Sequence, residues 1–169
     1  MLTIEKPGAM QAWADAARVA GQRVALVPTM GALHAGHMAL VAEARRRADR
    51  VVVSVFVNPI QFDRRDDFER YPRTLADDAA RCEGQGVDAI YAPNAADMYP
   101  EGFQTGVEVG ALTAPLCGRT RQGHFRGVTT VVTPRKCPCR VRPQSGAASA
   151  LTSTAVWKPS GYMSAAVGV

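Results

Sequence analysis

The chain has 169 residues, of which 47% are hydrophobic and 21% charged, a size and balance typical of one soluble globular domain with or without a tail. Its formal net charge is +5, yet the fifteen acidic side chains and fifteen of the basic ones all lie within residues 1–133. The whole positive excess therefore lies in residues 134–169, which argues against a nucleic-acid-binding role for the larger part of the chain.

Neither a membrane protein nor a disulfide-stabilised protein fits this sequence. The longest strongly apolar run, Val51–Val57, is far shorter than the roughly 20 residues of a membrane-spanning helix. The N-terminus carries Glu5 and Lys6 and lacks the apolar stretch of a signal peptide. The four cysteines show no disulfide framework. We therefore expect a reduced, cytoplasmic protein that binds neither a membrane nor nucleic acid.

Hydrophobic patterning predicts helices and strands in alternation. The predicted helices cover residues 8–20, 35–48 and 74–85, and the predicted strands cover residues 23–28, 50–57 and 87–92. Gly21 follows the first helix and suits the left-handed position beyond a helix end. The nearly continuous β-branched run over residues 50–57 is typical of a parallel strand covered on both faces. The order α, β, α, β, α, β predicts an open α/β fold with right-handed crossovers.

The two best predicted strands end in the most distinctive segments of the chain, PTMGALHAGH (28–37) and NPIQF (58–62). Ligands of open α/β sheets bind beyond the carboxyl ends of the strands. In the first segment, His34 and His37 flank a helix start, and such a start favours phosphate. An ordinary glycine-containing turn with two surface histidines is the alternative, and the position between a strand and a helix disfavours it.

The string PTMGALHAGH resembles the HxGH phosphate-binding signature of the nucleotidyltransferase superfamily. Together with VVVSVFVNPIQF, YPRT, MYPEG and GHFRGVTTVV, it closely resembles the pantothenate synthetase (pantoate–β-alanine ligase) family over nearly all of residues 1–133. The resemblance implies that residues 1–133 form a Rossmann-like nucleotidyltransferase domain with a parallel sheet. It also implies a homodimer whose small-molecule substrates are ATP, pantoate and β-alanine, with magnesium.

The same resemblance implies a two-step ligation. ATP and pantoate form a pantoyl-adenylate and pyrophosphate, and the amine of β-alanine then attacks the activated acyl group to give pantothenate and AMP. Such chemistry needs alignment and charge stabilisation more than covalent help from the protein.

Residue by residue, the resemblance places ATP on the segment made of Met30, Gly31, Ala32, Leu33, His34, Ala35, Gly36 and His37. His34 and His37 would contact the phosphates, with His37 as proton donor. Gln61 would hold pantoate and the β-alanine side of the site, and Asn58 would help to position pantoate. Asp77 would lie near magnesium and the phosphates.

Simpler roles stay open for several of these residues. Asn58 and Gln61 could merely satisfy backbone groups of a loop, a common use of amides. Asp77 and Asp78 could serve only as the acidic first turn of a helix, and this is the interpretation we favour for them. We expect His124 to pack or to order a loop, outside the catalytic set.

The resemblance ends near Thr133. The family continues with a lysine-bearing FGEKD-type segment and an SSRN-type loop, whereas residues 134–169 contain neither, and no acidic residue. We expect these residues to be an irregular tail after a truncated domain, and we hypothesise a reading-frame shift or a truncation. The functional alternatives are an active ligase, an inactive remnant that keeps nucleotide binding or subunit association, and an adenylyltransferase of another acid.

Overall fold

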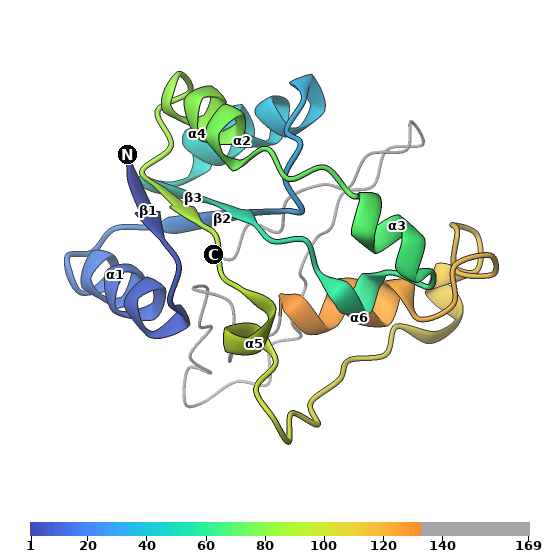
Figure 1. Ribbon diagram of the computed structural model, residues 1–169. Coiled ribbons are helices and arrows are strands. Elements are labelled where there is room, and N and C mark those ends of the chain that lie inside the picture. The colour runs from blue at the N-terminus through green and yellow to red at the C-terminus, as the bar shows by residue number, and fades with distance from the viewer. Residues whose placement is uncertain (133–169) are drawn as a thin grey trace.

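A computed structural model describes residues 1–132, so the expected tail over residues 134–169 lies outside the described residues. The framework is one parallel sheet with helices on both faces, which confirms the predicted α/β class (Figure 1). In space its strands lie in the order β1 (Leu2–Ile4), β4 (Ala89–Tyr91), β3 (Arg50–Val55) and β2 (Val24–Thr29). Only β1 is absent from the sequence prediction.

All three predicted helices are present, together with shorter helical segments that the sequence pattern did not indicate. The three expected helices are α1 (Pro7–Val19), α2 (Ala35–Arg47) and α4 (Leu75–Glu83). The sequence pattern did not predict the short helices α3 (Arg65–Arg70), α5 (Ala95–Met98) and α6 (His124–Val131), or the 3₁₀ turns η1 (Pro59–Gln61) and η2 (Gly110–Thr113). Within the described range, no helix has the length and apolar character needed to cross a membrane.

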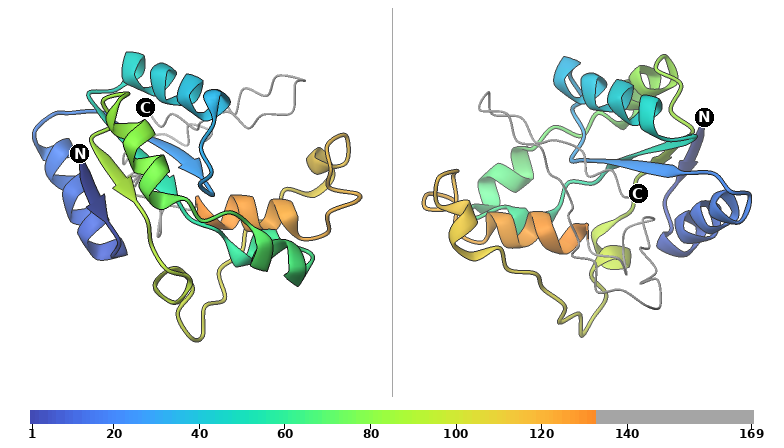
Figure 2. Two further views of the ribbon diagram at one scale, coloured as in Figure 1. Left: turned by 45° about the horizontal axis from the view of Figure 1, so that its top comes forward. Right: turned by 180° about the vertical axis from the view of Figure 1, so that it is seen from behind.

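Alternate side chains of the strands enter two separate apolar cores. Val51 and Val53 of β3 lie in the core that contains Val41 of α2, whereas Val52 lies in the core that contains Met10 of α1. Figure 2 shows the matching layers, with α2 and α4 on one face of the sheet and α1 on the other. Because both faces are covered, β3 has a nearly continuous run of β-branched residues instead of strict alternation.

The path of the chain across the sheet explains which face each helix covers. The chain starts at the β1 edge, crosses through α1 to β2 at the opposite edge, and returns through β3 to β4. Every crossover between parallel strands is expected to be right-handed. The chain moves across the sheet in one direction through α1 and in the opposite direction through α2 and α4, so α2 and α4 cover the face opposite to α1.

The carboxyl ends of β2, β3 and β4 lie side by side. Thr29 at the end of β2 pairs with Val55, and Ser54 pairs with Tyr91 at the end of β4. The turns that follow β2 and β3 therefore lie at one edge of the sheet, which we call the carboxyl edge.

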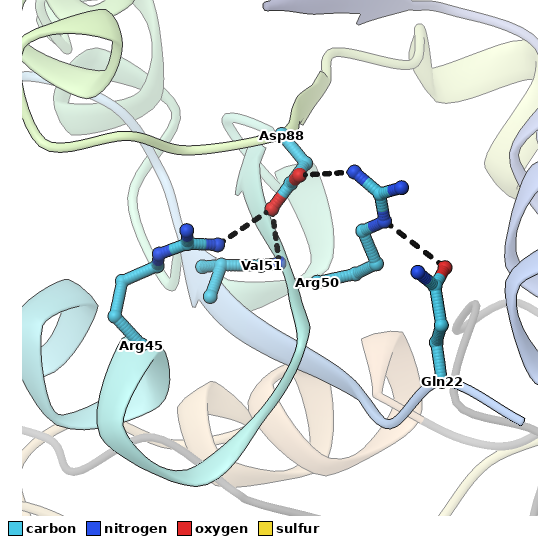
Figure 3. Close-up of polar contacts among 5 residues, drawn as sticks. All are labelled: Gln22, Arg45, Arg50, Val51 and Asp88. Carbon is cyan, nitrogen blue, oxygen red and sulfur yellow. Dashed lines mark hydrogen bonds and ion pairs between the residues drawn. The ribbon is translucent and has the colours of Figure 1, made fainter.

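A charge cluster joins the elements at the opposite, amino edge (Figure 3). Asp88, just before β4, accepts hydrogen bonds from Arg45 Nη1 at 2.9 Å, Arg50 Nη1 at 2.8 Å and the Val51 N–H at 2.8 Å. Arg50 Nε also donates to Gln22 Oε1 at 3.0 Å. This carboxylate links α2, β3 and β4 at the edge away from the distinctive sequence segments.

We expect Asp88→Ala to lower the free energy of unfolding by about 2 kcal/mol, mainly because the Val51 N–H loses its acceptor in a partly buried place. The two arginines contribute less, since water reaches their guanidinium groups. Urea unfolding with an unchanged m-value measures the loss. Asp15→Ala, which removes only an exposed partner of Arg18 on α1, is the control. Equal stability of the two variants would contradict the role of Asp88.

Candidate functional site

The turn between β2 and α2 contains two consecutive residues in left-handed conformations. Gly31 has φ +87° and Ala32 has φ +51°. A Cβ on Gly31 would lie 3.0 Å from Val55 Cγ1 and 3.1 Å from Asp78 Oδ2, so a side chain would be crowded here as well as strained by the conformation. Thr29 holds the start of the turn, because its Oγ1 donates to Ser54 O at 2.6 Å and accepts from the Gly31 N–H at 3.1 Å.

Asp78 holds the second half of the turn from α4. Its side chain is buried, with Oδ2 accepting from the Ala32 N–H at 3.0 Å and Oδ1 from the Leu33 N–H at 2.7 Å. Thr74 Oγ1 donates to the same Oδ2 at 3.2 Å. A buried carboxylate needs partners of this kind. The expectation that Asp78 serves only a helix first turn is therefore wrong, since it fixes the backbone that leads into His34.

His34 and His37 cap the start of α2 reciprocally. His34 Nδ1 accepts from the Gly36 N–H at 3.1 Å, and His37 Nδ1 accepts from the His34 N–H at 3.3 Å. The two ring centroids are 4.1 Å apart. Because each Nδ1 accepts from a backbone N–H, the hydrogen-bond network assigns the hydrogen of each neutral ring to Nε2. Both histidines can thus act as hydrogen-bond donors without carrying charge.

Burial keeps His37 neutral at neutral pH. It lowers the pKa of His37 below the usual 6.5, the adjacent His34 lowers this pKa further, and the nearby Asp78 opposes both effects. The N-terminus of α2 adds the partial positive charge of the helix dipole. Neutral Nε2–H donors beside a helix N-terminus form an arrangement suited to phosphate oxygens.

The turn after β3 forms the second half of the site, at the same carboxyl edge. Asn58 is fully buried and accepts from the Ile60 N–H at 3.4 Å, so it satisfies a backbone group of the loop, the simpler role left open for it above. Its Nδ2 donates to Gln61 Oε1 at 2.7 Å and to Gly127 O at 3.1 Å. The Tyr99 hydroxyl donates to Asn58 Oδ1 at 2.8 Å.

Helix α6 supports Gln61 from a distant part of the sequence. His124 is buried with Nδ1 2.9 Å from Gln61 O and Nε2 3.3 Å from Arg121 Nη1, and burial lowers its pKa. A neutral ring that donates through Nδ1 and accepts through Nε2 satisfies both contacts. A Cβ on Gly127 would lie 2.4 Å from Ile60 O, so glycine permits this close approach of α6 to η1. These contacts agree with the packing or loop-ordering role considered for His124 above.

Asp77 lies apart from these buried polar groups. Its side chain is exposed on α4, next to Asp78. Among residues 1–132, no three His, Cys, Asp or Glu side chains gather into a group that could hold a metal ion. Magnesium is often held by one or two carboxylates together with phosphate oxygens. The described residues thus fit magnesium only as an ion that accompanies a phosphate ligand, with Asp77 as its predicted carboxylate.

Sequence reasoning missed three residues that build this site: Asp78, Tyr99 and Gly127. Tyr99 and Gly127 lie within MYPEG and GHFRGVTTVV, two of the motifs that carry the family resemblance. These motifs marked both residues but did not indicate what they contact. For Asp78 the available signal was the Thr74–Asp78 spacing of one helical turn, which places both side chains on one face of α4.

Known proteins similar to this chain belong to one family. A family model described as pantoate-beta-alanine ligase matches residues 2–142. The pantothenate synthetase of Syntrophomonas wolfei is 57% identical over 133 residues, which are 78% of this chain and 47% of that protein. The pantothenate synthetase of Geotalea uraniireducens is 58% identical over 132 residues, with the same coverage of 78% and 47%. The chain thus spans about half the length of the curated relatives it matches.

Solved structures agree with the sequence relatives. The crystal structure of pantothenate synthetase from Thermus thermophilus matches with a TM-score of 0.70 and 48% identity, over 78% of this chain and 46% of that one. The pantoate-beta-alanine ligase from Francisella tularensis, complexed with beta-gamma ATP and beta-alanine, matches with a TM-score of 0.72 and 36% identity, over 78% and 51% of the two chains.

We expect Asp78→Asn to lower the free energy of unfolding by about 2 kcal/mol, because an amide nitrogen replaces one of the two oxygens that accept backbone N–H groups. Chemical denaturation measures this. Asp77→Asn is the matched control, since the same change one residue earlier affects an exposed side chain. A loss of stability that is equal in both variants would contradict the role assigned to Asp78.

The lowered pKa of His37 predicts an imidazole titration midpoint below 6.5 in the free protein. NMR of the imidazole Cε1–H signals measures it, with His37→Gln to assign the signal. The unfolded chain binds a proton at a pH where folded His37 does not, so stability falls as the pH drops through 6.5 towards the folded pKa. Added pyrophosphate should raise the midpoint, whereas a midpoint above 6.5 without it would contradict the assignment.

Proposed function

Because the chain belongs to the pantoate–β-alanine ligase family, we propose that its carboxyl edge performs the chemistry of that family, joining pantoate to β-alanine through a pantoyl-adenylate. A pantoate carboxylate oxygen attacks the α-phosphorus of ATP, and the bond to pyrophosphate breaks. The β-alanine amine then attacks the acyl carbon, AMP leaves, and the amine gives up a proton. ATP and β-alanine together in the Francisella tularensis relative support this pair of substrates.

The residues Met30–His37 form the proposed ATP segment. The Nε2–H groups of His34 and His37 supply donors to phosphate oxygens, and the N-terminus of α2 adds partial positive charge. Charge grows on the departing pyrophosphate, and donors already fixed in place stabilise it without reorganisation. The negative charge of bound phosphate also raises the affinity of His37 for a proton, which suits its proposed role as proton donor.

Gln61 is the proposed contact for pantoate and for the β-alanine side of the site. Its neutral amide can bond hydroxyl and carboxylate oxygens without adding charge. The buried Asn58 side chain donates a hydrogen bond from Nδ2 to Gln61 Oε1. Magnesium enters as the counter-ion of ATP, with Asp77 nearby. A homodimer in the cytoplasm is the further expectation from the family, and light scattering measures the oligomer.

One observation carries this proposal: two turns at the same sheet edge present complementary chemistry. The first is the reciprocally capped histidine pair after β2, which suits phosphate. The second is the buried amide pair after β3, which suits a polar, uncharged contact to an acid. The in-register ends of the two strands bring these turns together.

The deciding experiment measures pyrophosphate release by this chain with ATP and pantoate, before and after adding β-alanine. We expect release to depend on pantoate, and we expect His37→Ala to lower the rate by roughly 100-fold or more. Binding of ATP without turnover would instead support a remnant that keeps nucleotide binding. Turnover with a different acid alone would support another adenylyltransferase.

A further inference from the structure

The side chain of Asn58 has every hydrogen-bonding position occupied by the protein. An amide offers two donor hydrogens and two acceptor positions. Its Oδ1 accepts from the Ile60 N–H and from the Tyr99 hydroxyl, and its Nδ2 donates to Gly127 O and Gln61 Oε1. With 0% exposure and no position left, Asn58 has no means of contacting a ligand directly.

Backbone groups on both sides determine which way the Asn58 amide points. The Ile60 N–H can only donate, and the Gly127 carbonyl can only accept. A reversed amide would face donor to donor and acceptor to acceptor, each an unsatisfied buried group. Burial raises the pKa of Tyr99 to about 12, so its hydroxyl keeps its hydrogen and donates to Oδ1. The two backbone partners require this orientation, and donation by the Tyr99 hydroxyl agrees with it.

The orientation of Asn58 determines the orientation of Gln61. The Gln61 oxygen Oε1 lies 2.7 Å from Asn58 Nδ2 and must be the acceptor of that bond. The other end of the Gln61 amide is then Nε2, which carries two hydrogens. His124 holds the Gln61 carbonyl at 2.9 Å, so the main chain of Gln61 is held as well as its side chain.

We propose that Asn58 is a positioning residue that sets the polarity of the Gln61 amide, so that the site presents N–H donors and selects ligands with an acceptor oxygen. The inference rests on the proposed contact between Gln61 and the acid substrate and deepens it. A carboxylate or hydroxyl oxygen of pantoate meets this requirement. A ligand that places only a hydrogen-bond donor opposite the Gln61 Nε2 hydrogens forms no hydrogen bond there and binds more weakly.

The first test needs no substrate and uses the wild-type chain. Asn58 and Asn94 both cap short helical turns, but Asn94 is exposed at the start of α5. Hydrogen exchange of side-chain amides by NMR should show the Asn58 Nδ2 hydrogens protected at least ~100-fold relative to those of Asn94. Equal exchange rates would overturn the inference, because the Asn58 amide would then not be held.

The second test is a double-mutant cycle on pantoate binding, measured by calorimetry with a non-hydrolysable ATP analogue. The variants are Asn58→Leu, Gln61→Met and both together, with Asn94→Leu as the matched control. If Asn58 acts through Gln61, each single change weakens binding about tenfold, and the double variant is no weaker than Gln61→Met. Losses that multiply in the double variant would show a direct contact of Asn58 and overturn the inference.

The two tests separate this inference from the function on which it rests. Absence of pantoate binding to the wild-type chain would refute the proposed acid, while the exchange experiment still decides whether Asn58 is locked. Thermal melts of the variants establish that they fold, and unchanged affinity of Asn58→Leu for the ATP analogue alone shows that the histidine turn is intact.

Discussion

The parallel, in-register ends of β2 and β3 are the constraint on which the site depends. Parallel strands present their carboxyl ends at one edge, and the pairing of Thr29 with Val55 makes the two strands end at the same level. The histidine turn and the amide turn begin within a few residues of that pair. A slip of the register would separate them along the strands and would turn alternate side chains of β3 away from their cores.

Backbone groups, more than side chains, determine the chemistry of both turns. In the first turn, amide hydrogens of Gly36 and His34 assign the tautomers of the two histidines, while Asp78 holds the preceding backbone. In the second, the Ile60 N–H and the Gly127 carbonyl orient Asn58. Because backbone donors and acceptors cannot reverse their roles, the polarity that the site presents is set before any ligand arrives.

Sequence reasoning predicted the local features well and the long-range ones poorly. The run of β-branched residues in β3 and the motif after β2 identify their elements, because hydrophobic period and helix-start chemistry are local. Strand β1 is too short to show a period, and its pairing with β4 is a tertiary contact. The roles of Asp78, Tyr99 and Gly127 depend on contacts across 41 to 69 residues, which spacing along the chain does not reveal.

The pairing of β1 with β4 has a consequence for how the protein is made. Of the four strands of the described sheet, β1 (Leu2–Ile4) is synthesised first, and it pairs with β4 (Ala89–Tyr91), which is synthesised last. β1 therefore has no partner strand in this sheet until β4 has been synthesised, whereas β2 and β3 can already pair with each other. The strand that is made first is thus among the last that can join the sheet, and a nascent chain stalled before Ala89 would leave β1 exposed to pairing with other chains.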